Sequence, residues 1–96
     1  MSRRCVFVTY DVGDPKRWRK VFRIMKDYGD HLQLSVFRVE LPQKHVDDLK
    51  AKLAKVVTDA DQVLFVDVGP AEGLRSAEVT ALGRPYLPSA PAAVIV

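Results

Sequence analysis

The sequence predicts an α+β fold with the element order βαββαβ. Residues 16–28 and 42–57 repeat apolar side chains at helical spacing, and segments rich in Val, Phe and Leu lie before, between and after them. The 96 residues suffice for one domain with a thin core. A ferredoxin-like sandwich, in which both helices cover one face of the sheet, fits this order best. We expect this domain at residues 1–82 and a C-terminal tail or strand at residues 83–96.

The first strand and the first helix follow directly from residue patterns. Residues 4–11, RCVFVTYD, form a nearly continuous apolar run, which is typical of a central strand. Asp14 can then cap a helix, and Pro15 suits its first turn. Gly29 is expected to end this helix as a C-terminal stop. The predicted buried face of the helix consists of Trp18, Val21, Phe22, Met25 and Tyr28.

The second half of the chain is less regular. Residues 33–41, QLSVFRVEL, are strand-like, either as one strand or as two short strands kinked near Ser35. Pro42 opens a second helix that is expected to run to about Val57. Residues 62–68 predict a further strand, and residues 78–82 a short one. The apolar end Ala-Val-Ile-Val is expected to pair as a strand with a sheet, that of a partner copy included.

The composition is that of an ordinary soluble globular protein, with 48% hydrophobic and 28% charged residues. No apolar run approaches the length of a membrane span, and no apolar segment of a secretion signal follows the first residues. A cytoplasmic protein without membrane contact is therefore expected. The single cysteine, Cys5, lies in an apolar strand and is interpreted as a small buried hydrophobic residue.

Positive charge is concentrated in the first half of the chain. Residues 1–43 carry nine Lys/Arg against five Asp/Glu, and residues 44–96 carry six against seven. A solvated helix face is the simpler interpretation of this excess. The cations nevertheless share one face with no interleaved acid, a pattern that favours binding to phosphates of a nucleic-acid backbone without base readout. The predicted basic face of the first helix comprises Lys16, Arg19, Lys20, Arg23 and Lys26.

Asp11 stands at the end of an apolar strand and has two interpretations. It either accepts N–H groups of the following loop or binds a metal ion such as Mg²⁺ through oxygen. One carboxylate is too few for a metal site, so the second interpretation requires a symmetric homodimer, whose twofold axis brings identical residues together. Arg17 and Arg19 follow closely and are predicted to hold phosphate near that metal.

Several other polar residues carry weaker signals. His31 is interpreted as a base or, more simply, as a surface or capping residue, and His45 as a structural residue at a helix start. Ser35 and Phe37 share one strand face, with Phe37 either in the core or in a dimer surface. The sequence contains no Ser/His/Asp triad pattern and no Gly-rich phosphate-binding loop.

Three segments together carry a family resemblance. TYDV, then KRWRKVFRIMKDYG, then HLQLSVFRVEL resemble, in this order and spacing, the CRISPR-associated adaptation protein of the Cas-two family. The resemblance covers residues 5–68. It implies a ferredoxin-like homodimer in which the C-terminal strand crosses to the partner's sheet. It also implies that the protein works with the CRISPR integrase, the larger adaptation subunit, to capture new spacers.

The resemblance implies site residues as well. Asp11, preceded by Tyr10, falls on the family's strand-end aspartate, which implies a Mg²⁺ ligand at the dimer axis. Ser35 and Phe37 match its Ser-Val-Phe motif, and Arg17 and Arg19 fall in its basic stretch. His31 stands where many members have arginine, and a neutral imidazole lacks the fixed charge that would hold phosphate permanently.

Three functions remain open at this stage. The first is a Mg²⁺-dependent endonuclease acting on RNA or DNA in CRISPR adaptation, with Asp11, Arg17 and Arg19 as catalytic residues. The second is a non-catalytic scaffold that holds duplex DNA for the integrase. The third is a toxin-like RNase, or a dimer module of the same fold, unrelated to CRISPR.

Overall fold

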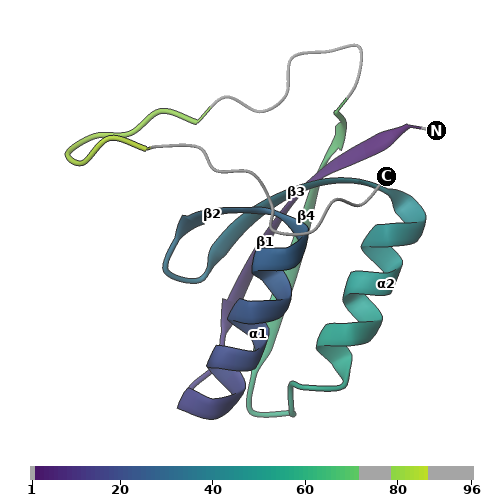
Figure 1. Ribbon diagram of the computed structural model, residues 1–96, viewed down its shortest axis with the longest axis vertical. Coiled ribbons are helices and arrows are strands. Elements are labelled where there is room, and N and C mark those ends of the chain that lie inside the picture. The colour runs from purple at the N-terminus through teal and green to yellow at the C-terminus, as the bar shows by residue number, and fades with distance from the viewer. Residues whose placement is uncertain (1, 72–78, 87–96) are drawn as a thin grey trace.

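A computed structural model describes residues 2–71 and 79–86. The predicted order βαββαβ is confirmed, and both helices lie on one face of the sheet (Figure 1). The predicted segment 33–41 is resolved into two strands separated by a turn at Leu34 and Ser35. In chain order the elements are β1 (Arg3–Asp11), α1 (Pro15–Tyr28), β2 (Asp30–Gln33), β3 (Val36–Pro42), α2 (Gln43–Ala54) and β4 (Gln62–Pro70).

The sheet has the strand order β2-β3-β1-β4, with every neighbouring pair antiparallel. The helix α1 joins the parallel strands β1 and β2 across β3, and α2 joins the parallel strands β3 and β4 across β1. Right-handed crossovers place both helices on the same side of the sheet, which is the ferredoxin-like arrangement predicted (Figure 1). Val8 pairs with Phe37 on one side and with Phe65 on the other. At its end, Asp11 pairs with Gln62, so β1 stops where β4 starts.

Alternation along β1 separates the two faces of the sheet. Val6, Val8 and Tyr10 are buried under the helices, whereas Phe7, Thr9 and Asp11 point to the other face. The helices contribute Val21, Met25, Leu49 and Leu53 to the core, each at most 2% exposed. The lone cysteine, Cys5, is buried, as expected.

The other face of the sheet is covered by neither helix (Figure 1). Thr9 pairs with Leu64 and Phe7 with Val66, and directly paired residues of antiparallel strands project to the same side. The side chains of Leu64, Val66 and Val68 are 49%, 49% and 52% exposed. We call these three residues the apolar strip of β4. Asp11 projects to the same face as this strip.

Both ends of α1 agree with prediction, and the structure adds a packing reason for the glycine that follows it. Asp14 is the N-cap, and its carboxylate accepts the N–H of Arg17 at 2.9 Å. Gly29 is the C-cap, and its backbone is extended, with φ −154°. A Cβ at this position would collide with the backbone oxygen of Arg38 and lie 2.6 Å from Cγ1 of Val39. Glycine is therefore required by the close approach of β3.

Two other boundaries differ from prediction. The helix expected to reach Val57 ends at Ala54, and Val56 and Val57 turn back to bond the carbonyl of Leu53 and pack against the core. The short strand predicted at residues 78–82 is wrong over residues 79–82, which form no strand. Residues 87–96, where pairing with a sheet was predicted, lie outside the described residues. Neither described helix is long and apolar enough to cross a membrane.

Candidate functional site

Asp11 is the exposed last residue of β1. Within residues 2–71 and 79–86, its carboxylate makes no hydrogen bond or ion pair, and the capping role belongs to Asp14 instead. The first interpretation of Asp11, a carboxylate that satisfies loop N–H groups, therefore does not describe this structure. Asp11 remains free to bind a ligand.

A single chain offers this carboxylate few co-ligands. The described residues contain no group of three His, Cys, Asp or Glu side chains placed to hold a metal ion. The nearby carboxylates of Asp14 and Asp61 are both engaged by Arg17. A free carboxylate oxygen suits Mg²⁺, which commonly takes one or two protein carboxylates and fills its other positions with water or substrate phosphate. The residues present thus fit Mg²⁺ only if a second copy, water or substrate completes the site.

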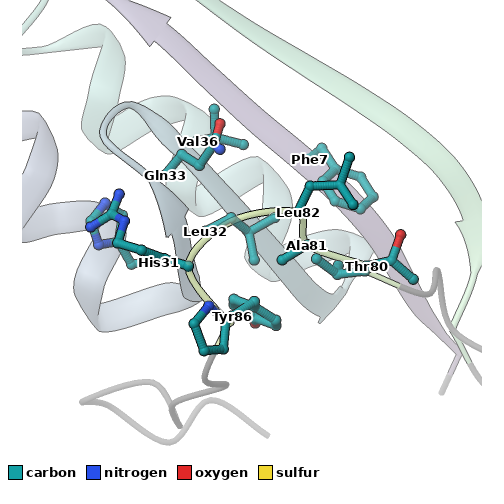
Figure 2. Close-up of a pocket in the computed structure, with 12 residues that line it drawn as sticks. Phe7, His31, Leu32, Gln33, Val36, Thr80, Ala81, Leu82 and Tyr86 are labelled. Carbon is teal, nitrogen blue, oxygen red and sulfur yellow. The ribbon is translucent and has the colours of Figure 1, made fainter.

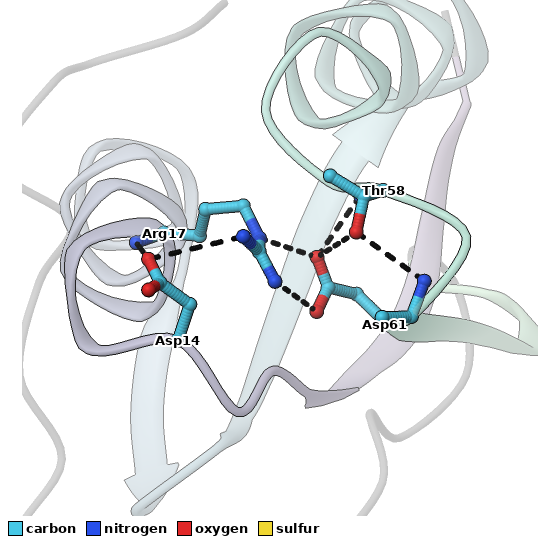
Figure 3. Close-up of polar contacts among 5 residues, drawn as sticks. Asp14, Arg17, Thr58 and Asp61 are labelled. Atoms are coloured by element: carbon cyan, nitrogen blue, oxygen red, sulfur yellow. Dashed lines mark hydrogen bonds and ion pairs between the residues drawn. The ribbon is translucent and has the colours of Figure 1, made fainter.

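Arg17 joins two segments that are distant in sequence (Figure 3). Its Nε donates to Oδ2 of Asp61 at 2.8 Å and its NH2 group donates to Oδ1 at 3.1 Å, a bidentate pair. The NH1 group lies 3.9 Å from Oδ2 of Asp14. The guanidinium that was predicted to hold phosphate is therefore already bound to a carboxylate.

Asp61 is the buried member of this pair, with 1% of its side chain exposed. The same carboxylate accepts the backbone N–H of Thr58 at 2.9 Å and its hydroxyl at 3.3 Å. The hydrogen bond from Arg17, followed by that from the Thr58 N–H, holds the pKa of Asp61 below its usual range. In turn, the hydrogen bond to Asp61 raises the pKa of Arg17. Neither Thr58 nor Asp61 was singled out from the sequence.

The exposed cations of α1 have no such partners. Among the described residues, no ion pair or side-chain hydrogen bond is made by four of them, Lys16, Arg19, Lys20 and Arg23. The fifth, Lys26, lies over the ring of Phe22 at 5.7 Å. All four are exposed along one side of the helix. We restrict the name basic face of α1 to Lys16, Arg19, Lys20 and Arg23, without Lys26.

The motif residues Tyr10 and Phe37 lie inside the protomer. Phe37 is 0% exposed and Tyr10 is 5% exposed, with their rings stacked at 6.3 Å. Of the two alternatives predicted for Phe37, the core is therefore the one that fits, because the helices of its own chain cover both rings. Ser35 links the same region: its hydroxyl accepts from Nε1 of Trp18 at 3.2 Å, and its carbonyl accepts from the Tyr10 N–H at 3.0 Å. Burial raises the pKa of Tyr10 to about 12, so its phenol stays neutral near pH 7.

His31 packs against this aromatic cluster and is partly exposed. Its ring lies edge-on to Phe22 at 5.0 Å and stacks on Phe37 at 4.8 Å. The roles predicted for it, a base or a surface or capping residue, stay predictions. His45 lies in the first turn of α2, with Nδ1 3.6 Å from Oδ2 of Asp48, in agreement with a structural role.

A groove of about 730 Å³ lies elsewhere on the molecule (Figure 2). Residues of β1, β2 and β3 form one wall, and part of the segment 79–86 forms the other. Among the residues that the structure describes, neither Asp11 nor any other carboxylate lines this groove, so it is separate from the candidate site. Its lining includes Phe7, Leu32, Gln33, Val36, Thr80, Arg84 and Tyr86.

Comparison with known proteins places these features in a family. The model of the family described as CRISPR associated protein Cas2 matches residues 4–72. The chain is 38% identical over 90 residues to the CRISPR-associated endoribonuclease Cas2 of Geobacter sulfurreducens, covering 93% of this chain and 94% of that protein. It is 42% identical over 80 residues to the CRISPR-associated endoribonuclease Cas2 1 of Rhodospirillum rubrum, covering 82% and 78%. A solved structure described as the crystal structure of cas2 superposes with a TM-score of 0.73 and 28% identity, covering 99% of this chain and all of that one.

Proposed function

The chain belongs to the CRISPR-associated Cas2 family, and we propose that it is a Mg²⁺-dependent endonuclease that hydrolyses RNA during CRISPR adaptation. The observation that carries this proposal is the Asp11 carboxylate, exposed and without a partner among the described residues. RNA is placed before DNA because the two relatives described above are both named endoribonucleases.

The proposal requires two copies of the chain, and the face of the sheet that neither helix covers supports a homodimer. The apolar strip of β4 leaves about half of each of three large side chains in water. Burying apolar surface is favourable, and a domain of this size gains much of its stability from such contacts. Asp11 projects to the same face, so packing two copies through this face brings their Asp11 carboxylates to the same interface.

Each group of the chain then has a defined task. The two Asp11 carboxylates hold Mg²⁺, and the chemistry that this ion supplies when bound is Lewis-acid stabilisation of charge on the phosphate oxygens. The basic face of α1 binds the nucleic-acid backbone through its phosphates and carries no base specificity. Arg19, which is exposed and has no carboxylate partner among the described residues, is the arginine of this stretch that remains able to contact phosphate.

Replacing Asp11 tests the proposal. In Asp11→Asn the shape is kept but the charge that holds the ion is lost, so we expect the rate of RNA cleavage to fall about 100-fold or more, the scale of losing one charge-stabilising group. The matched control is Asp59→Asn, another exposed aspartate whose side chain makes no hydrogen bond or ion pair within the described residues; this variant should cleave at the wild-type rate. If Asp11→Asn, purified identically, cleaves as fast as wild type, the proposed activity is wrong.

A second function is favoured by a different observation. The four exposed cations of α1 have no partners among the described residues, whereas one chain supplies only one free carboxylate at the site. This balance supports a non-catalytic scaffold that holds duplex DNA for the CRISPR integrase. In this case Asp11→Asn leaves spacer acquisition intact.

Charge reversal tests the scaffold. Each lost phosphate contact should reduce the slope of log affinity against log salt by about one. We therefore expect Arg19→Glu to weaken duplex DNA binding and flatten its salt dependence, and Lys16→Glu with Arg23→Glu to add to both effects. Lys44→Glu, an exposed cation at the start of α2, is the control and should change neither quantity by a comparable amount. If the affinity for duplex DNA changes neither with salt nor with these charge reversals, the scaffold function is ruled out.

A further inference from the structure

We propose that Arg17 and Asp61 act together as a positioning pair that fixes Asp11 at the end of β1, and that Arg17 does not bind phosphate itself. The inference deepens the proposed function and rests on it, because it concerns how the proposed metal ligand is held. It assigns a task to Asp61, a residue that the sequence did not single out, and it changes the task of Arg17 from contact with substrate to support of Asp11.

The pair is built as a structural clamp. Two guanidinium donors and two Thr58 donors meet one carboxylate that is 1% exposed. A buried carboxylate is costly unless its charge is paired and its oxygens accept hydrogen bonds, and both conditions are met here. The Arg17 guanidinium binds this carboxylate through its Nε/Nη2 edge, and its Nη1 lies 3.9 Å from Oδ2 of Asp14, so two carboxylates compete with a phosphate for the same guanidinium.

The Arg17–Asp61 pair is connected to Asp11 by contacts on both sides, through Gln62 and through Asp14. Asp61 immediately precedes Gln62, and Gln62 pairs with Asp11 across β4 and β1. The guanidinium of Arg17 donates to the carboxylate of Asp61, and the backbone N–H of Arg17 donates to the carboxylate of Asp14. Only residues 12 and 13 separate Asp14 from Asp11, so the short link that carries the proposed metal ligand is fixed at both ends.

The same two strands provide a matched control. At the far end of β1 and β4, Nε of Arg4 donates to Oδ2 of Asp67 at 3.1 Å and its NH2 group donates to Oδ1 at 2.8 Å. This pair has the same bidentate geometry, but its side chains are 35% and 42% exposed, and it lies at the opposite end from Asp11. Removing it should loosen that end and leave the candidate site unchanged.

Amide hydrogen exchange tests the positioning directly and does not depend on catalysis. Local opening accelerates exchange only in the segment that opens. We expect Asp61→Asn to accelerate exchange about tenfold or more at the Asp11–Gln62 end of the sheet while β3 exchanges at the wild-type rate. Asp67→Asn should accelerate only the far end. If Asp61→Asn accelerates exchange equally at the Asp11–Gln62 end, in β3 and at the far end of β1 and β4, the pair only stabilises the whole fold. If exchange is unchanged, the pair does not fix the end of β1. Either result overturns the proposal.

Steady-state kinetics separate positioning from phosphate binding. We expect Arg17→Gln and Asp61→Asn each to lower kcat about 10- to 100-fold, as small misplacements of reacting groups do, with KM for RNA almost unchanged. The double variant should have nearly the same kcat as either single variant, because both substitutions disrupt the same Arg17–Asp61 interaction. If Arg17 contacts phosphate instead, Asp61→Asn frees it and keeps or tightens RNA binding, whereas Arg17→Gln raises KM and reduces the salt slope. That pattern would contradict the proposal.

The two proposals fail in distinguishable ways. Full activity in Asp11→Asn removes the proposed nuclease, and the exchange experiment still decides whether the pair fixes the end of β1. Conversely, an inactive Asp11→Asn together with wild-type exchange and kcat in Asp61→Asn removes the positioning role alone.

Discussion

At the scale of single residues, three carboxylates near the end of β1 have three different tasks because their hydrogen-bond partners differ. Asp14 caps α1, Asp61 pairs with Arg17, and Asp11 has no partner among the described residues. The cap was predictable, since it depends on a residue three positions away. The task of Asp61 was not, because Arg17 lies 44 residues earlier and no local pattern links them.

The Arg17–Asp61 pair makes stability depend on pH. The folded pKa of Asp61 lies below the ordinary value of 3.8, so the stabilisation is fully present above about pH 4 and is lost as pH falls through the lowered pKa. We expect the free energy of unfolding of wild type to exceed that of Asp61→Asn at neutral pH, and this difference to shrink below about pH 4. Urea unfolding of both proteins at a series of pH values measures it. A difference that stays constant from neutral pH to pH 2 would contradict this assignment.

At the scale of elements, α1 was the best predicted part of the fold. Its cap, its proline and its apolar spacing are all local signals, and they located both ends within one residue. The end of α2 was missed because Val56 and Val57 continue the apolar pattern while packing outside the helix. The packing reason for Gly29 was missed because it depends on the close approach of β3, a tertiary contact.

Two glycine substitutions test this explanation of the end of α1. In Gly29→Ala the new Cβ meets the backbone of Arg38 and Cγ1 of Val39, so β3 must shift, and we expect a loss of about 1–3 kcal/mol in unfolding free energy. In Gly13→Ala the Cβ meets nothing within 4 Å, so stability should be unchanged or rise by up to about 1 kcal/mol. Thermal or urea unfolding compares them. Equal effects of the two substitutions would show that close packing is not the reason for glycine at position 29.

At the scale of the whole molecule, the ferredoxin-like order was predicted because it follows from the succession of periodic patterns. Which face of each strand meets the helices was harder to predict. Alternation shows that Ser35 and Phe37 share a face, but only the pairing of Phe37 with Val8 places it under the helices. The choice between core and dimer surface for Phe37 stayed open in the sequence for this reason. The free face instead carries Asp11 and the apolar strip of β4.

The sharing of one site by two copies of Asp11 is the central claim, and a mixed dimer measures it most directly. Dimers with one wild-type and one Asp11→Asn protomer can be isolated with two different affinity tags and assayed for Mg²⁺-dependent RNA cleavage. Because the proposed site holds one ion between the two Asp11 carboxylates, we predict that the mixed dimer cleaves nearly as slowly as the dimer with two substituted protomers. A mixed dimer that cleaves at half the wild-type rate would show that each copy works alone and would contradict the claim.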